Sequence, residues 1–212
     1  MIRSELPTAR IAALTGPSHA EEVGAFLPTT NVAASEDAQL CAFVQDALMS
    51  DTFRVYRSDD MVGAELGGAL KNVIAVCAGI CDGLGCGHNA KAALITRGIA
   101  EIARLGVKMG AQRQTFAGLS GIGDLIVTCT GTLSRNRLLG ELIGRGMTLS
   151  DAQKEVKAVA EGVFTAHAAN ELAAQNGVEM PIIAQANAVL FGGKDPGEAV
   201  RELMGRERRA EF

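Results

Sequence analysis

The lysine at position 71 has an uncommon setting for a charged side chain. It lies in the stretch GAELGGALKNVIAV (63–76), among Gly, Ala, Leu, Val and Ile, with Glu65 as the acid within the stretch. Burial disfavours the charged form of an amine, so a buried lysine can exchange a proton near neutral pH as a general acid or base. Alternatively, its aliphatic stem packs on a helix while its ammonium group reaches water. The stretch alone leaves both interpretations open.

A second candidate is Asp124, which follows a glycine-rich turn in GLSGIGDLIVTC (118–129). A carboxylate at this place could pair with an ammonium group or accept hydrogen bonds from the hydroxyls of a polyol. It could equally be the N-cap of a helix that begins with the apolar run after it. The spacing is compatible with either role.

A third candidate segment is TLSRNRLLGELIGRG (132–146), in which Ser134, Arg135 and Asn136 begin an amphipathic helix. A helix start offers free backbone N–H groups and the positive end of a dipole, and arginine adds a planar fork suited to phosphate. The segment therefore predicts an anion site, with an ordinary capped helix and solvent-facing arginines as the alternative. The residues expected on the inner face of this helix are Leu138, Leu139, Leu142 and Ile143.

The cysteine-rich segment CAGICDGLGCGH (77–88) could be interpreted as a metal site, but its spacing argues against one. Cys77 and Cys81 are one helical turn apart in an apolar helix, where cysteine behaves as a small hydrophobic residue, and paired C-x-x-C motifs are absent. The glycines of GLGCGH follow a helix rather than a strand, so they are not a dinucleotide fingerprint. We expect no metal here.

Composition excludes several classes of partner. The 212 residues are 48% hydrophobic with a formal net charge of −4, and no lysine- and arginine-rich run provides an electrostatic surface for nucleic acid. No apolar run is expected to reach the length that spans a bilayer, and the first residues lack a signal-peptide hydrophobic region. Five cysteines in a chain of this size favour reduced thiols. We therefore expect a cytoplasmic protein without a membrane span or a nucleic-acid partner.

Strands and helices alternate in the first 58 residues. ARIAALTGPS (9–18), TTNVAASE (29–36) and FRVYRS (53–58) predict strands, and DAQLCAFVQDALMS (37–50) predicts a helix. A strand–helix–strand order indicates an α/β segment, which is too short to close a doubly wound sheet by itself.

From about residue 59 onward the pattern is almost entirely helical, and we place a domain boundary there. We expect five to seven helices, the first over about 60–80 and the second after an N-cap at Asn89. SDAQ (150–153) matches a capping box. Later boundaries are a helix end at Asn176–Gly177, helix starts at Pro181 and at Asp195–Pro196, and a last helix end at Gly205.

Taken together, five motifs resemble the bacterial type of NAD(P)-dependent glycerol-3-phosphate dehydrogenase. LTGPSHAEEV, GGALKNVIAVCAGICDGLGCGHNAKAALITRG, GIGDLIVTC, SRNR and VAEGVFTAHAANELA…GVEMPI occur in the order and at the spacing of that family, over essentially the whole chain. The resemblance implies a mainly α fold. Residues 1–58 would be the last strands and helix of an incomplete Rossmann domain. Residues 59–212 would be a helical substrate domain like the C-terminal part of 6-phosphogluconate dehydrogenase.

The resemblance also implies an activity and a set of site residues. The enzymes of the family interconvert glycerol 3-phosphate and dihydroxyacetone phosphate with NADH or NADPH, which supplies phospholipid synthesis. Lys71 would be the catalytic acid and base, and Asp124 would bind the substrate hydroxyl and hold the ammonium group. The other matched positions are Gly16, Ser18, Ser134, Arg135 and Asn136 for substrate, and Ala20, Arg135, Val159 and Glu161 for NAD or NADP.

Two parts of the family pattern are missing from these residues. The glycine-rich fingerprint expected upstream of Gly16 is absent, and so is a lysine in a TKG-type segment. We therefore expect a fragment of a longer protein, or an isolated substrate domain, that binds dinucleotide poorly and turns over little. The alternatives are another dehydrogenase with a helical C-terminal domain, a metal-binding domain, and a helical dimerisation module without catalysis. A homodimer and a small phosphorylated substrate are the partners that we expect.

Overall fold

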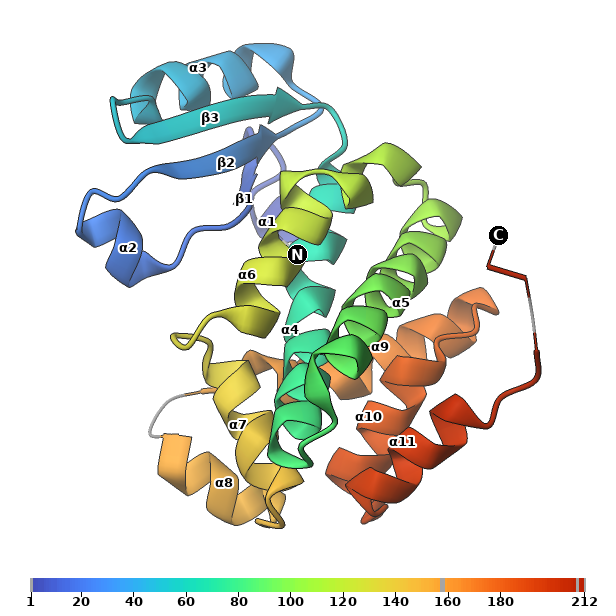
Figure 1. Ribbon diagram of the computed structural model, residues 1–212. Helices are drawn as coiled ribbons and strands as arrows, with labels where there is room; N and C mark the ends of the chain where they lie inside the picture. The colour runs from blue at the N-terminus through green and yellow to red at the C-terminus, as the bar shows by residue number, and fades with distance from the viewer. Residues whose placement is uncertain (1, 157–158, 209, 212) are drawn as a thin grey trace.

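The structure is a computed structural model that describes residues 2–156, 159–208 and 210–211. Figure 1 shows a small sheet with its helices at one end of the molecule and a larger group of helices beside it. The mainly helical architecture with a short sheet near the N-terminus confirms the predicted fold class. The first part contains α1 (Ile2–Glu5), β1 (Ala13–Thr15), α2 (Ala20–Gly24), β2 (Thr29–Ala34), α3 (Ala38–Leu48) and β3 (Phe53–Ser58).

The second part consists of helices. It contains α4 (Met61–Gly83), α5 (Gly87–Lys108), the 3₁₀ turn η1 (Arg113–Ala117), the π-helical turn η2 (Leu119–Gly123), α6 (Asp124–Thr130), α7 (Arg135–Gly144), α8 (Leu149–Val156), α9 (Glu161–Asn176), α10 (Pro181–Gly192) and α11 (Pro196–Met204). Eight α-helices after residue 59 in the described part of the chain exceed the five to seven expected, because short helices such as α6 carry little periodic signal. The domain boundary near residue 59 stays a prediction.

The three strands form one sheet in the order β1-β2-β3. β2 is antiparallel to β1 and parallel to β3, with Asn31 opposite Val55 in the parallel pair. A parallel pair needs a crossover connection, and α3 supplies it and packs against both strands (Figure 1). Ala33 and Val55 on these strands are buried. All three predicted strands and the helix between them are confirmed.

The long helix α4 forms the centre of the helical part and packs against α5, α6, α7 and α9. It crosses α7 at glycines: a Cβ added at Gly79 would lie 1.9 Å from the carbonyl oxygen of Arg137, and one at Gly140 would lie 1.9 Å from that of Val76. The two helix backbones therefore touch, which a larger residue at either glycine would prevent.

By length and composition, α4 contradicts the expectation that no apolar segment could span a membrane. It is the one helix among the described residues that is long and apolar enough, at 23 residues, but 67% of its apolar window is buried inside the protein. Val73, Ile74 and Val76 are fully covered by neighbouring helices. The structure therefore places α4 as a core helix.

Several predicted helix ends are confirmed. Gly177 adopts φ 63° directly after α9, Pro181 is the first residue of α10, and the Asp195 carboxylate accepts a hydrogen bond of 2.8 Å from the backbone N–H of Glu198 at the start of α11. Gly205 follows α11 as expected. These ends depend on the conformational preferences of one or two residues, which the sequence shows directly.

Three local predictions are wrong. Asn89 lies inside α5, which already begins at Gly87. The capping interaction of α8 is made by the Thr148 hydroxyl, which accepts from the backbone N–H of Asp151 at 3.2 Å, so the capping box does not start at Ser150. Leu138 was expected on the inner face of α7 but is 40% exposed, whereas Leu139 and Ile143 are buried.

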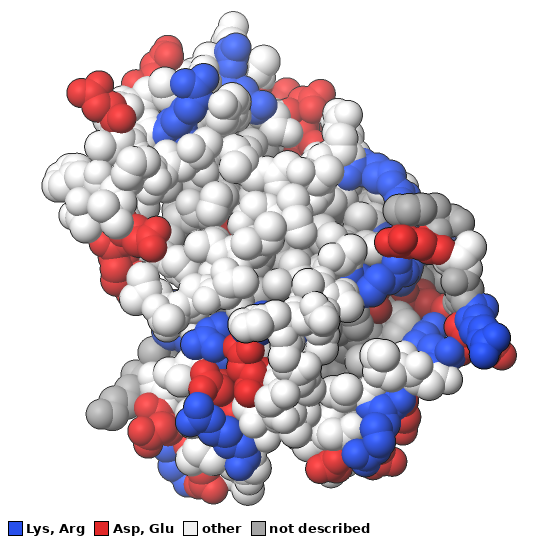
Figure 2. All heavy atoms as spheres, viewed as in Figure 1, with Lys and Arg blue, Asp and Glu red and all other residues white. Residues whose placement is uncertain are grey.

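Charged side chains of both signs surround a largely uncharged centre on the face seen in Figure 2. Lysines and arginines alternate with acids over α7 and α8 and over the C-terminal helices, without a large region of one sign on this face. Mixed charges of this kind are typical of a solvated surface.

Candidate active site

The ammonium group of Lys71 forms an ion pair with the carboxylate of Asp124. Lys71 lies in the middle of α4 and Asp124 is the first residue of α6, and their side chains are only 20% and 4% exposed. One turn along α6, the Thr128 hydroxyl donates to the carbonyl oxygen of Asp124 at 2.6 Å and lies 3.5 Å from its Oδ1. Asp124 therefore faces an amine instead of capping a helix, and Lys71 is held inside the protein.

The buried carboxylate of Asp124 depends on Lys71 as its opposite charge. Burial raises the pKa of Asp124, while the Lys71 ammonium, the Thr128 hydroxyl and the nearby His19 act in the opposite direction. A buried carboxylate without an opposite charge is costly, often by several kcal/mol. Lys71 therefore offsets part of the cost of burying the Asp124 carboxylate, and the ion pair holds the two side chains together.

Close packing between α4 and η2 sets the register of this pair. A Cβ added at Gly67 would lie 2.2 Å from the carbonyl oxygen of Ser120, so the two backbones are in contact at this point. Lys71 and Asp124 each lie four residues further along, which is about one helical turn on the same face. The close approach of the two backbones at Gly67 therefore brings the Asp124 carboxylate to the side of Lys71.

Ser134 and Arg135 begin α7 as the sequence predicts. Ser134 is buried, and its hydroxyl caps the helix by accepting a hydrogen bond of 3.2 Å from the backbone N–H of Arg137. A hydroxyl that accepts in this way still has a hydrogen to donate. The Arg135 side chain is 53% exposed and lies 3.4 Å from Glu161. This helix start therefore combines N–H groups, a hydroxyl and an accessible guanidinium, which suits an anion.

Asn136 occupies a different position from its two neighbours in the motif. It is buried, its amide nitrogen donates to the side-chain oxygen of Asn72 at 3.1 Å, and its side-chain oxygen accepts from the backbone N–H of Gly162 at 2.9 Å. These bonds connect α4, α7 and α9. The structure shows Asn136 as a connection between helices, and its predicted contact with substrate stays a prediction.

The loop after β1 carries the other proposed substrate residues. Gly16 is buried with φ 131°, a conformation that favours glycine, and the Ser18 hydroxyl donates to the Gly16 carbonyl oxygen at 3.1 Å. Asn31 on β2 donates to the Ser18 oxygen at 3.2 Å. A bond of 2.7 Å between the hydroxyls of Thr15 and Ser120 connects this loop to η2, so the loop lies against the helical part near the lysine.

The proposed cofactor residues are all accessible. Ala20 begins α2, Val159 is 60% exposed, and the exposed Glu161 begins α9 beside Arg135. The structure thus brings Arg135 and Glu161 together and leaves Ala20 and Val159 on the surface. The preceding residues 157 and 158 lie outside the described part of the chain.

Sequence reasoning missed three side chains at this site. Thr128 hydrogen-bonds Asp124, Asn72 holds Asn136, and the Nε2 atom of His19 is buried without a hydrogen-bond partner among the described residues. His19 faces the backbone at Gly131, where an added Cβ would lie 3.0 Å from Nε2. Thr128 follows Asp124 by four residues, and this spacing could have indicated it, whereas the other two depend on distant contacts.

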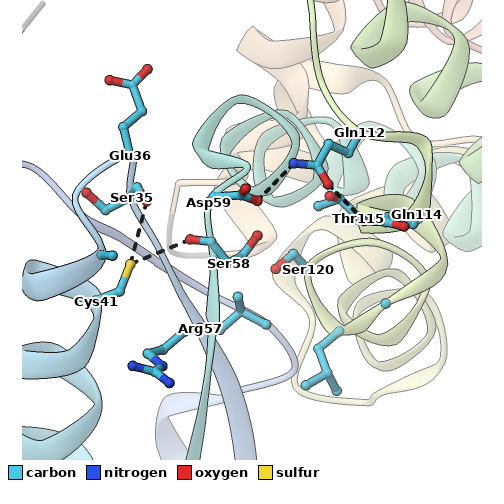
Figure 3. A pocket seen from close by; sticks show the side chains of 14 residues that line it. Ser35, Glu36, Cys41, Arg57, Ser58, Asp59, Gln112, Gln114, Thr115 and Ser120 are labelled. Atoms are coloured by element: carbon cyan, nitrogen blue, oxygen red, sulfur yellow. Dashed lines mark hydrogen bonds between the residues drawn. The ribbon is translucent and has the colours of Figure 1, made fainter.

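A large cavity of about 630 Å³ lies elsewhere, between the sheet and the η1–η2 segment. Figure 3 shows Ser35 and Ser58 from the ends of β2 and β3 on one side and Thr115 and Ser120 on the other. Neither Lys71 nor Asp124 lines it. The chemistry of the ion pair, rather than the volume of this cavity, therefore defines the candidate active site.

The cysteines of the segment 77–88 differ in burial. Cys77 and Cys81 are buried in α4, while Cys86 is half-buried after it. Among the described residues, no group of three or more His, Cys, Asp and Glu side chains could hold a metal ion. Burial raises the pKa of Cys81 to about 12 and that of Cys77 further, as expected of thiols in an apolar environment.

These features define a class of protein, in which an α/β segment is joined to a helical domain with a buried lysine–carboxylate pair, as in two-part dehydrogenases. The family model described as NAD-dependent glycerol-3-phosphate dehydrogenase C-terminus matches residues 60–201, and the corresponding N-terminus model matches residues 1–41. The chain belongs to the NAD-dependent glycerol-3-phosphate dehydrogenase family, and the resemblance seen in its motifs is confirmed.

Individual relatives agree with this assignment. Glycerol-3-phosphate dehydrogenase (NAD(P)+) of Agathobacter rectalis is 56% identical over 100% of this chain, and the protein of the same name from Geobacter sulfurreducens is 57% identical over 93% of it. The crystal structure of glycerol-3-phosphate dehydrogenase from Coxiella burnetii matches 97% of the chain with 41% identity and a TM-score of 0.94. The chain spans 63% of the first protein, 59% of the second and 63% of the crystallised chain.

Proposed function

We propose that the chain takes part in the interconversion of sn-glycerol 3-phosphate and dihydroxyacetone phosphate with NADH or NADPH. The observation that carries the proposal is the buried ion pair between Lys71 and Asp124. An amine in this position is the proton donor and acceptor that a ketone–alcohol interconversion needs. The named relatives support the choice of substrate, and supply of glycerol 3-phosphate for phospholipid synthesis would be the metabolic role.

In the reducing direction, Lys71 in its ammonium form donates a proton to the carbonyl oxygen as negative charge develops there. The resulting amine takes the proton back when the alcohol is oxidised. Asp124 holds Nζ in one direction through the ion pair. In this role, Asp124 positions the acid, while Thr128 holds Asp124.

The start of α7 would bind the phosphate group of the substrate. Arg135 provides an accessible planar fork, and Ser134 has a hydroxyl hydrogen to donate. Binding of the phosphate then orients the carbonyl toward Lys71. In this way, binding energy from a group remote from the reacting atoms contributes to catalysis. Gly16 and Ser18 would contact the substrate from the opposite loop.

The accessible residues near Arg135 fit a partial site for a nicotinamide cofactor. Arg135 and Glu161 lie side by side on the surface, and together with Val159 and Ala20 they would hold one part of it. When bound, the cofactor supplies or accepts the hydride. Cytoplasmic location and a homodimeric state stay predictions.

The experiment compares Lys71→Met with Lys154→Met, an exposed lysine whose side chain is 74% accessible. Binding of dihydroxyacetone phosphate is measured by calorimetry, and its NADPH-dependent reduction is measured in an extended polypeptide that carries this sequence together with a dinucleotide-binding segment. Lys71→Met should remove turnover, while Lys154→Met should match the parent in both measurements. Turnover by a folded Lys71→Met variant at the parent rate would refute the role given to Lys71. Failure of the parent to bind the ligand would refute the proposed function.

A further inference from the structure

The two arginines of the SRNR motif have different environments. Arg135 is 53% exposed and has one long ion pair with Glu161, at 3.4 Å. The Arg137 side chain is only 15% exposed and forms bonds in three directions. An arginine whose guanidinium donors are already hydrogen-bonded to protein groups is a poor direct ligand for an added anion. Arg137 therefore has a role other than direct anion binding.

Arg137 holds both ends of the turn that precedes α7, residues 131–134. Its Nε donates to the carbonyl oxygen of Gly131 at 3.2 Å, and its backbone N–H donates to the Ser134 hydroxyl at 3.2 Å. One residue therefore fixes where the 131–134 turn begins and where the helix starts. Ser134 is the last residue of this turn and Arg135 follows it, so the turn places both proposed phosphate ligands.

Asp82, near the end of α4, holds Arg137 in place. Its Oδ2 accepts from Arg137 at 2.7 Å, and its Oδ1 forms an ion pair with Lys91 of α5. Burial by itself raises the pKa of Asp82, but the bonds from Lys91 and Arg137 outweigh it and lower the pKa below the usual value. A second acid, Glu141, accepts from Arg137 at 3.2 Å. The segment 77–88, considered first as a metal site, thus supplies the carboxylate that holds this arginine.

We propose that Arg137 is a positioning residue for the phosphate site, and that it acts by tying the 131–134 turn to Asp82 on the same helix as Lys71. This inference rests on the proposed function. Asp82 and Lys71 are eleven residues apart on α4, about three helical turns, so one rigid element carries both the acid and the anchor of the anion site. The distance between the bound phosphate and the amine is then set by α4 and α7, whose backbones touch.

Replacing Arg137 by lysine keeps the positive charge and changes the geometry of its hydrogen bonds. Arginine can reach the Gly131 carbonyl and the Asp82 carboxylate together because its guanidinium presents several donors in one plane, whereas lysine is a point charge on a flexible stem. Arg137→Lys therefore keeps the charge but loses one of the two bonds. If Arg137 served only as a nearby positive charge, the lysine variant would bind anions as the parent does.

The experiment measures binding of glycerol 3-phosphate to the full chain by calorimetry. Arg145→Lys is the matched control, because Arg145 directly follows α7 and pairs with Glu141 while its side chain is 62% exposed. Arg137→Lys should weaken binding about tenfold, which corresponds to the loss of about one hydrogen bond, and Arg145→Lys should bind like the parent. Asp82→Asn should weaken binding to a similar extent, and the double variant should add little to either change.

A second readout distinguishes positioning from a general loss of stability. Hydrogen exchange of the backbone amides in 131–137 should become faster in Arg137→Lys, while the amides of the α5 core around Ile102 should exchange as in the parent. Parent-like binding by Arg137→Lys, together with a loss in Arg135→Ala, would overturn this proposal alone. If the parent bound no glycerol 3-phosphate, or if Arg135→Ala bound it unchanged, the proposed phosphate site would fail and this inference with it.

Discussion

Replacing Glu101 by glutamine tests whether a buried carboxylate from one helix caps another. Glu101 lies in α5 and is 4% exposed, and its carboxylate accepts from the backbone N–H of Ile182 at 3.0 and 3.1 Å and from that of Ile183 at 3.4 Å. These N–H groups are at the start of α10, where they would otherwise be unsatisfied. The glutamine side chain can accept with its oxygen but turns an NH₂ group toward a donor, so about 1 kcal/mol of stability should be lost at neutral pH.

The pH dependence of this loss follows from the ionisation of Glu101. Burial raises its pKa to about 7, against the bonds from Ile182 and Ile183, which lower it. A carboxyl group whose pKa is higher in the folded state binds its proton more tightly when folded. It therefore adds stability as the pH falls through about 7 toward 4.5, and that stability is lost as the pH rises. Between about pH 8 and about pH 5.5 the gain is about 2 kcal/mol.

Urea unfolding of the parent and of Glu101→Gln at these two pH values measures the effect. All other ionisable groups are common to both proteins, so their contributions cancel in the difference between them. We expect the parent to gain about 2 kcal/mol more than Glu101→Gln on acidification. An equal change in both proteins would show that Glu101 does not titrate in this range and would refute the reasoning.

Two further predictions concern packing and thiols. Gly140→Ala should destabilise the chain by about 3 kcal/mol or more, because its Cβ would meet the Val76 carbonyl oxygen at 1.9 Å. Gly192→Ala is the control, since an added Cβ there meets no described atom within 4 Å, and equal melting temperatures of the two variants would contradict the close crossing. Of the five thiols, Cys86 alone is not buried, so one thiol per chain should react quickly with a disulfide reagent in the folded protein. Cys86→Ser should remove this fast phase, and its persistence would show that a buried thiol becomes exposed.

Local signals in the sequence were sufficient for part of the fold. The end of α9 at Gly177 and the starts of α10 and α11 at Pro181 and Asp195 follow from the conformations these residues favour. Asn89 failed as an N-cap because Gly87, with φ 82°, already turns the chain into α5. The capping of α10 by Glu101 joins residues 81 positions apart, which no local pattern can indicate.

The candidate site, like the fold, could be predicted only in part from local sequence. Lys71 and Asp124 each had two interpretations, and only their contact across 53 positions shows that they form a pair. SRNR looked like one anion-binding unit in the sequence. In the structure the Arg135 side chain is exposed and Ser134 is a buried helix cap, whereas the side chain of Asn136 is hydrogen-bonded to Asn72 and Gly162. Which side chains of a motif remain available depends on tertiary contacts.

The contact between the backbones of α4 and α7 has a genetic consequence. Every residue other than glycine carries a Cβ, so every amino-acid replacement at Gly79, Gly83, Gly140 or Gly144 places an atom within 2.4 Å of a backbone atom of the facing helix. A single nucleotide change in any of these codons is therefore either silent or harmful to the packing that separates the lysine from the phosphate site. Variation in this chain should accumulate on the outer faces of the helices, while the crossing of α4 and α7 stays unchanged.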